Sequence, residues 1–300
     1  MLSYWLRAVR IRFLLASVIA VILGLAVNWW QHDSLDLAYA GLTLAGVVSL
    51  HASVDLLNDY WDYKRKIDTE TKRTKFSGGT GVLPDGLLKP SQVYRAGIAM
   101  LVIGAIIGSY FVIERGITIA VILLFAIISI YFYSTRIVDS GLGEVFVAIK
   151  GTMIVLGTYF VQAQNITIQP VIIGIISGIL SSTVLFVNSF PDYEADKAHG
   201  RRTLVIVLGK AKAASGAWAF PSITSGIIVS SVVVHILPAF SLVALAALPI
   251  AVKSCHLLKE TFDRTDEFVP VMKNIVSYSR ITGILLIIGF IADHFIGRIH

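Results

Sequence analysis

Charged residues are scarce in this chain. Only 15% of its 300 residues are Asp, Glu, Lys or Arg, whereas 56% are hydrophobic. A typical soluble domain carries about 25% charged residues, so this composition excludes an ordinary water-soluble protein. The mean hydropathy of +0.78 agrees. We therefore interpret the chain as an integral protein of the cell membrane, with the lipid bilayer as a partner.

Cysteine is almost absent. The single cysteine, Cys255, has no second thiol with which to form an intramolecular disulfide. One thiolate does not make a metal site by itself. The sequence therefore excludes a disulfide framework, and we interpret Cys255 as a core residue.

A continuous basic face is also missing, although the net charge is +6. The cations alternate with apolar segments, which argues against nucleic acid as a partner. If the amino terminus is cytoplasmic, the outer segments contain only the cations Arg115 and Arg298. Lys and Arg gather in the cytoplasmic segments of membrane proteins. This asymmetry predicts a cytoplasmic amino terminus and an outer carboxyl terminus.

Long apolar runs fill most of the chain. A membrane-spanning helix needs about 20 mostly apolar residues. Nine runs qualify, at Ile11–Trp30, Leu37–Leu57, Val93–Val112, Ile117–Tyr133, Glu144–Gln162, Val171–Ser189, Ala214–Val234, Ile236–Leu258 and Ile275–Ile296. The first run is too long to resemble a cleaved signal peptide. We predict an all-α membrane protein with nine transmembrane helices in one domain, residues 1–300.

One polar pattern occurs twice. The second predicted helix ends in Asn58-x-x-x-Asp62-Tyr63, and the sixth ends in Asn188-x-x-x-Asp192-Tyr193. The two patterns are four helices apart, so both have the same direction across the membrane. We predict a parallel internal repeat, with halves of roughly 1–135 and 136–300, and acidic motifs at the cytoplasmic ends of both helices.

The spacing of the acids favours a metal ion. Asp55, Asp59 and Asp62 recur at i, i+4 and i+7, so they share one helix face, and Asp192 and Asp196 share a face of the sixth helix. Stacked like charges are costly near the membrane unless a cation neutralises them. Oxygen ligands and substrate phosphates suit Mg²⁺. The sequence therefore indicates a site for a diphosphate carried on Mg²⁺.

The loops after these helices contain cations and glycines. Cations neutralise phosphate oxygens, and glycines let backbone amides approach an anion. From these loops we expect diphosphate binding by Lys72, Arg73, Lys197 and Arg201, and Arg136, which follows the fourth predicted helix, is a further candidate. The alternatives are a solvated membrane boundary for each cation and a flexible loop for Gly78-Gly79-Thr80-Gly81.

With these motifs the chain resembles the UbiA superfamily of intramembrane prenyltransferases along nearly its whole length. The resemblance implies that the acids bind Mg²⁺ and the diphosphate of an isoprenoid donor. On this basis the candidate metal ligands are Asn58, Asp62, Asp68, Asp192 and Asp196, and the candidate catalytic acids are Asp59, Asp62, Asp192 and Asp196.

Several stretches are similar to the menaquinone branch, the 1,4-dihydroxy-2-naphthoate prenyltransferases. They include Gly78–Leu83, Gly141–Phe146 and Asp192–Lys197. The sequence departs from that branch at Lys66, where many superfamily members have an acid, and at Lys150, where the branch has an apolar residue. Lys150 either extends to the cytoplasmic interface or faces the cavity.

The resemblance implies electrophilic aromatic prenylation, in which the allylic C–O bond of a polyprenyl diphosphate ionises and an aromatic acceptor attacks. Tyrosine rings shield such a cation by their faces, although tyrosines also form interfacial belts. The candidate pocket residues are Asn188, Tyr131, Tyr133, Lys150 and Tyr159. A lone histidine such as His51 is interpreted as structural.

Three alternatives stay open. The same chemistry could use another acceptor, such as 4-hydroxybenzoate, a tocopherol or haem precursor, or a glycerophosphate ether lipid. A cation-coupled transporter also has intramembrane acids, but its sites usually lie near the bilayer midplane. A structural scaffold leaves the paired acids unexplained.

Overall fold

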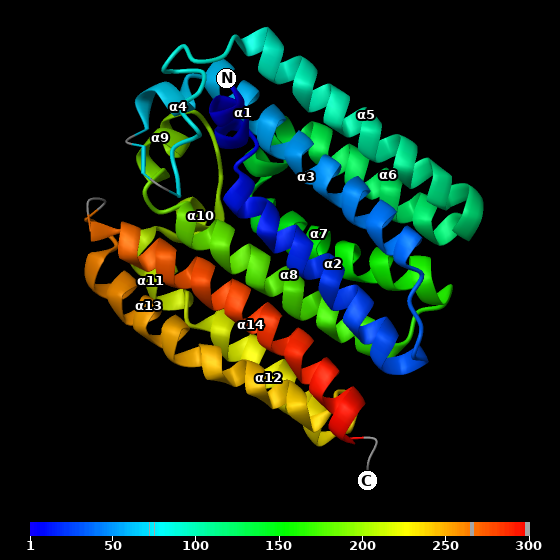
Figure 1. Cartoon of the computed structure of the whole chain (residues 1–300). Coiled ribbons are helices and arrows are strands. Elements are labelled where there is room, and N and C mark those ends of the chain that lie inside the picture. Colours follow the sequence, from blue (N-terminus) through cyan, green and yellow to red (C-terminus); the bar gives the residue numbers. More distant parts are fainter. Residues whose placement is uncertain (72, 75, 265–266, 298–300) are drawn as a thin grey trace.

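The structure is a computed structural model that describes residues 1–71, 73–74, 76–264 and 267–297. In these ranges the chain forms helices joined by turns and short loops, with no strand. Figure 1 shows the long helices side by side, with the amino terminus and the end of the last described helix at opposite ends of the bundle. Among the described residues nine helical segments are long and apolar enough to cross a membrane. The prediction of an all-α membrane protein with nine spans is confirmed.

The spans follow the predicted runs closely. They are α2 (Ile11–His32), α3 (Leu37–Lys64), α5 (Pro90–Arg115), α6 (Ile117–Phe132) continued by η1 (Tyr133–Ile137) and η2 (Val138–Ser140), α7 (Gly143–Ala163), α8 (Ile168–Asn188), α11 (Lys210–Gly216) with α12 (Ala219–Val233), η3 (Ala239–Ala247) with α13 (Leu248–Thr261), and α14 (Val269–Ile296). The short helices are α1 (Leu2–Ala8), α4 (Ile67–Glu70), α9 (Tyr193–Ala198) and α10 (Leu204–Leu208).

The seventh and eighth spans are interrupted, whereas the sequence predicted continuous helices there. Pro221 lies in the first turn of α12, and Pro249 lies in the first turn of α13. Proline has no N–H to donate to the carbonyl four residues earlier. Each proline therefore marks the point where a new helical segment begins.

Small residues set the distances between the central helices. A Cβ atom on Gly151 of α7 would lie 2.8 Å from Cα of Gly178 on α8. A Cβ atom on Gly24 of α2 would lie 2.7 Å from the carbonyl oxygen of Val155 on α7. Glycines allow such close backbone approach in membrane proteins. The positions of α2, α7 and α8 therefore depend on these glycines.

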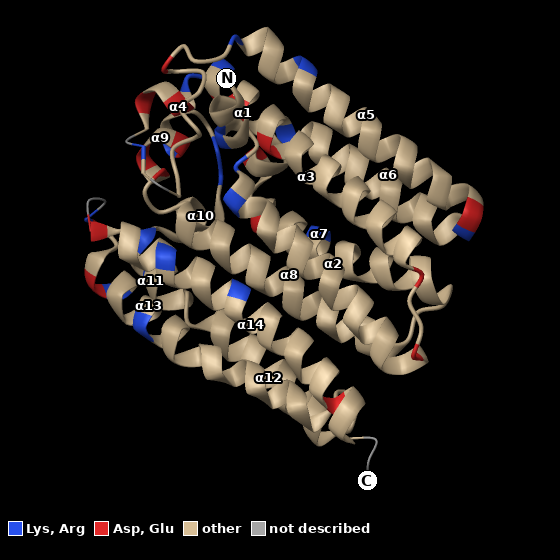
Figure 2. Ribbon diagram, viewed as in Figure 1, with Lys and Arg blue, Asp and Glu red and all other residues tan. Residues whose placement is uncertain are grey.

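Charged residues gather at one end of the bundle. Figure 2 shows them around α1, α4 and α9 and at the neighbouring ends of α11 and α13, whereas the middle of the bundle carries few. The Lys and Arg residues among them agree with the positive-inside rule for a cytoplasmic end. Arg298 lies outside the described residues. The parallel repeat and the orientation in the membrane stay predictions.

Candidate active site

The first acidic motif lies within the last two turns of α3. Asn58 Nδ2 donates a hydrogen bond of 2.7 Å to Asp62 Oδ2. The Asn58 side chain also accepts a hydrogen bond of 3.1 Å from the hydroxyl of Ser134 in η1. Asp62 is buried, with only 4% of its surface exposed. These bonds fix the side chains of both residues at the helix end.

Asp59 has a different environment from Asp62. Its carboxylate accepts hydrogen bonds from the backbone N–H of Thr80 at 3.1 Å and from the Thr80 hydroxyl. Arg10 Nη2 forms an ion pair with it at 3.1 Å. Asp59 does not line the cavity described below. The structure therefore places Asp59 as an anchor for the Thr80 loop and the amino-terminal segment, and its role as a catalytic acid stays a prediction.

The sequence predicted the second acidic motif on the sixth transmembrane helix, but the structure places both of its acids beyond the end of that helix. Helix α8 ends at Asn188, and Asp192 is the N-cap residue of the separate helix α9. Pro191 lies between them, and proline disfavours helix continuation. The backbone N–H of Asp196 donates to the carbonyl of Asp192 at 2.8 Å. The two acids are thus one turn apart on a short helix outside the membrane span.

Arg201 joins the two acidic motifs. Its Nη1 lies 3.1 Å from Asp196 Oδ1, and its Nη2 pairs with Asp62 Oδ1. Burial opposes the charge of Arg201, but the neighbouring carboxylates of Asp62 and Asp196 stabilise its charged form and raise its pKa. No group of three or more Asp, Glu, His or Cys side chains in the described ranges has an arrangement that could hold a metal ion. In this structure Arg201 neutralises the carboxylates instead.

The donor atoms nevertheless fit Mg²⁺. Asn188 Oδ1 and Asp192 Oδ1 are buried oxygens with no hydrogen-bond partner in the described structure. Burial and the charge of Asp196 raise the pKa of Asp192 to about 7. Burial and the charges of Asp62 and Asp59 raise the pKa of Asp68 to about 8. Oxygen atoms that are costly to leave unpaired are suited to a hard divalent cation.

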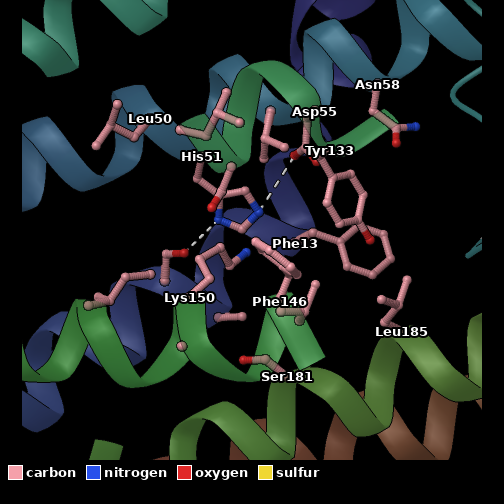
Figure 3. Close-up of a pocket in the computed structure, with 18 of the residues that line it drawn as sticks. Phe13, Leu50, His51, Asp55, Asn58, Tyr133, Phe146, Lys150, Ser181 and Leu185 are labelled. Carbon is pink, nitrogen blue, oxygen red and sulfur yellow. Dashed lines mark hydrogen bonds and ion pairs between the residues drawn. The ribbon is translucent and has the colours of Figure 1, made fainter. Parts of the chain in front are cut away.

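One cavity connects the two motifs with the membrane interior. Its polar end is lined by Asn58, Asp62, Asp68, Asn188, Asp192, Asp196 and Arg201. Deeper walls come from α3, α5, α6 and α7 and include Val47, Phe111, Ile122 and Phe146. Figure 3 shows Tyr133, Phe146 and Leu185 around the same space. The cavity therefore has a charged mouth and an apolar interior.

Three of the predicted pocket residues line this cavity, namely Asn188, Tyr133 and Lys150. Tyr131 does not, because it is 41% exposed on the outside of α6. Two residues correspond to about 200° of rotation in an α-helix, so Tyr131 and Tyr133 face opposite ways. Tyr159 is fully buried near the end of α7, where its hydroxyl donates to Gln31 at 2.5 Å. The structure places neither Tyr131 nor Tyr159 at this cavity, and their assignment to a substrate pocket stays a prediction.

Arg201 lines the cavity, and the other described cations predicted to bind diphosphate do not. Arg73 pairs with Asp85 at 3.0 Å. Arg136 and Lys197 are exposed, and Lys197 lies 5.6 Å from the ring centre of Tyr193. Lys72 lies outside the described residues. The assignment is therefore supported geometrically for Arg201 alone.

The sequence analysis missed Arg10. It lies just before α2 in a left-handed conformation, with φ of 45°, and it lines the cavity. Burial opposes its charge, but Asp59, Asp55 and Asp68 raise its pKa. In the sequence Arg10 was indistinguishable from a positive-inside cation. No local pattern identified its partner, which follows 49 residues later.

Comparison with known proteins agrees with this fold. A sequence model described as the UbiA prenyltransferase family matches residues 17–273. A solved UbiA homologue from Aeropyrum pernix K1, in its apo form, superposes with a TM-score of 0.69 at 16% identity, covering 92% of this chain and 97% of the other. A UbiA homologue from Archaeoglobus fulgidus, bound to GPP and Mg²⁺, superposes with a TM-score of 0.61 at 15% identity, covering 94% and 99%. At such low identity, the superpositions show a shared fold and nothing further.

Two curated relatives are 1,4-dihydroxy-2-naphthoate octaprenyltransferases. The protein of Bacillus subtilis is 28% identical over 200 residues, which are 65% of this chain and 63% of that protein. The protein of Escherichia coli is 25% identical over 299 residues, which are 95% of this chain and 94% of that protein. Because the family model matches most of its length, the chain belongs to the UbiA prenyltransferase family.

Proposed function

We propose that this protein catalyses Mg²⁺-dependent transfer of a prenyl chain from an isoprenyl diphosphate to an aromatic acceptor, namely 1,4-dihydroxy-2-naphthoate, in menaquinone biosynthesis. The observation that carries this proposal is one continuous cavity, which joins paired acidic motifs at its mouth to apolar walls. A polyprenyl diphosphate has the same division between a charged head and an apolar tail. The names of the two relatives support the choice of acceptor.

The mouth of the cavity would bind the diphosphate. Asp62, Asp192 and Asp196, with the side-chain oxygens of Asn58 and Asn188, would hold Mg²⁺. When bound, Mg²⁺ neutralises the negative charge that develops on the departing diphosphate. Asp68 lies beside these acids on α4, and we keep it as a candidate ligand.

Arg201 would bind the diphosphate at the mouth of the cavity. It already lies between Asp62 and Asp196, so it is placed to donate hydrogen bonds to a phosphate oxygen once those carboxylates have another partner. The backbone N–H of Gly78, which now donates to Asp192 at 3.3 Å, is a second donor at the same point. Preorganised donors of this kind stabilise a leaving group without a reorganisation cost.

The interior of the cavity would protect the reactive end of the donor. The allylic C–O bond breaks, the electron pair leaves with the diphosphate, and the ring carbon of the acceptor forms the new C–C bond. With the naphthoate acceptor that carbon then loses its carboxylate as CO₂. Tyr133 lines the cavity near the acids and would shield the allyl cation. Walls without water prevent capture of the cation as an alcohol.

The site would face the cytoplasm. The acidic motifs lie at the charged end of the bundle, with the amino terminus (Figure 2). Labelling of single cysteines by a membrane-impermeant thiol reagent, in a Cys255→Ser background, tests this orientation. A cysteine at the end that carries α9 should react only after the cells are opened.

The function is tested with the purified protein in detergent. We would supply geranylgeranyl diphosphate and Mg²⁺, with 1,4-dihydroxy-2-naphthoate and 4-hydroxybenzoate in parallel, and measure product masses. The proposal predicts a prenylated, decarboxylated naphthalenediol that is lost with EDTA. Product from 4-hydroxybenzoate alone would reject the acceptor, and failure to consume the donor would reject the enzyme class and favour a transporter.

A further inference from the structure

A second polar cluster lines the same cavity, apart from the acids proposed to bind the diphosphate. It contains His51 and Asp55 of α3 and Lys150 of α7 (Figure 3). Asp55 precedes Asp62 by seven residues, which corresponds to about 10 Å along an α-helix at 1.5 Å per residue. The cluster is therefore separated from the metal-binding mouth by roughly the length of a small aromatic molecule.

Lys150 has an ammonium group without a close partner. None of its described neighbours forms a hydrogen bond or an ion pair with Nζ, and the nearest anionic influence is Asp55. Figure 3 shows the side chain beside His51 and Phe13, inside the cavity. It does not extend to the interface, which was the alternative left by the sequence. A cation at membrane depth is costly unless an anion accompanies it, so this position is suited to an anionic ligand group.

Asp55 provides the complementary group. Its Oδ2 is buried and has no hydrogen-bond partner in the described structure. His51 Nε2 lies 3.8 Å from this oxygen, while Ser17 Oγ lies 2.6 Å from His51 Nδ1. The tautomer with a proton on Nε2 suits the carboxylate that faces it, so Ser17 then donates to Nδ1. Asp55 Oδ2 therefore remains able to accept a hydrogen bond from a ligand hydroxyl.

The surrounding walls favour a flat ring. Phe13 lies beside the Lys150 side chain in Figure 3, and Leu50 and Phe146 line the same cavity. Aromatic side chains pack against a ring by offset stacking or edge contacts. The cluster thus offers one cation, one hydrogen-bond acceptor and aromatic walls.

Given the proposed function, we propose that Lys150 and Asp55 form the acceptor-binding subsite. Lys150 pairs with the carboxylate of a hydroxylated aromatic acid, and Asp55 accepts a hydrogen bond from its ring hydroxyl. This assignment makes Lys150 a specificity-determining residue that selects acidic acceptors. His51 positions Asp55 and does not itself contact the ring.

The experiment compares the Lys150→Met variant with the unaltered protein. We would measure KM for the prenyl donor and for two acceptors, 1,4-dihydroxy-2-naphthoate and 1,4-dihydroxynaphthalene, which lacks the carboxylate. We expect the KM for the naphthoate to rise by roughly 10- to 100-fold, because a charge-assisted hydrogen bond is lost. The donor KM and the KM for the naphthalenediol should change by less than about threefold.

Two variants make the comparison specific. Lys253→Met is the matched control, because Lys253 is an exposed lysine on α13 outside the cavity lining, and it should leave all three KM values unchanged. Asp55→Leu, which removes the acceptor oxygens, should raise the KM for both acceptors, because both carry ring hydroxyls. Equal increases for donor and acceptor in Lys150→Met, or an unchanged naphthoate KM, would overturn the subsite.

Failure of the proposed function is distinguished by a direct binding measurement. If the unaltered protein forms no naphthoate product, isothermal titration with 1,4-dihydroxy-2-naphthoate still compares it with Lys150→Met. Affinity that is about tenfold weaker in the variant supports the subsite without turnover. Equal affinities, or no binding by either protein, reject it.

Discussion

Replacing Arg201 by leucine tests how the two acidic motifs are held together. Arg201 pairs with Asp62 and Asp196, whose exposed fractions are only 4% and 3%. Removing one partner of a buried ion pair costs about 3–5 kcal/mol, because the remaining charges are uncompensated. For a protein of 300 residues this corresponds to a decrease in Tm of roughly 5–8 °C. We expect this decrease without Mg²⁺ at pH 8.

The effect should depend on both metal and pH. Burial raises the pKa of Asp196, and Arg201 opposes that shift. Without Arg201 the pKa of Asp196 in the folded protein rises further above its value in the unfolded chain. The destabilisation is therefore absent at low pH, where Asp196 is protonated, and develops as the pH rises through the folded-state pKa of Asp196. Mg²⁺ binding to the folded state should also offset the loss. The Tm difference should therefore shrink at pH 5 and on addition of Mg²⁺.

The assay is thermal unfolding of the purified protein in detergent, followed by tryptophan fluorescence. Arg202→Leu is the matched control, because Arg202 is exposed next to the site and its substitution should leave the Tm nearly unchanged. If Arg201→Leu is as stable as Arg202→Leu without Mg²⁺, the inferred role of Arg201 is wrong. A Tm difference that persists unchanged in Mg²⁺ would contradict the proposed sharing of these carboxylates with the metal.

Three further predictions follow from individual residues. Asp192→Asn should lower Mg²⁺-dependent turnover at least about 100-fold, whereas Glu194→Gln, at an exposed position of α9, should change it little in the same assay. Because the pKa of Asp192 is raised to about 7, protons compete with Mg²⁺ for its carboxylate below that pH. The Mg²⁺ affinity measured by titration should therefore weaken by up to about tenfold per pH unit. An affinity that does not change between pH 8 and pH 6 would contradict this. Gly151→Ala should destabilise the protein by about 1–3 kcal/mol, because the added Cβ would lie 2.8 Å from Cα of Gly178. Gly226→Ala is the control, because Gly226 has open space around it, and it should leave the protein nearly as stable in the same unfolding measurement.

The sequence alone was sufficient for the membrane fold. Hydrophobic runs of about 20 residues have few alternatives in a bilayer, because every backbone polar group must be satisfied within the helix. The acids at 58–62 and 192–196 were also evident, since carboxylates are rare near apolar runs. Local composition therefore predicted the number of spans and the polar end of the site.

Prolines mark the local breaks in the helices. Pro191 separates Asn188 from Asp192, and Pro221 and Pro249 mark the starts of segments in the seventh and eighth spans. Hydropathy does not register them, because a window of apolar residues tolerates one proline. Hydropathy therefore predicts a sixth helix that continues through Pro191, whereas the structure has a separate helix after it.

Contacts between distant residues were decided only by the tertiary structure. Arg10 pairs with Asp59 and Arg201 pairs with Asp62, although each pair is far apart in the sequence. Lys150 lies beside His51, which belongs to another helix. Which face of a helix meets a neighbour depends on where glycines permit close approach, as at Gly151. In a lipid environment apolar faces are alike to the solvent, so hydrophobicity does not specify that choice. Local composition determines the membrane fold, whereas the arrangement of the site depends on how the helices pack.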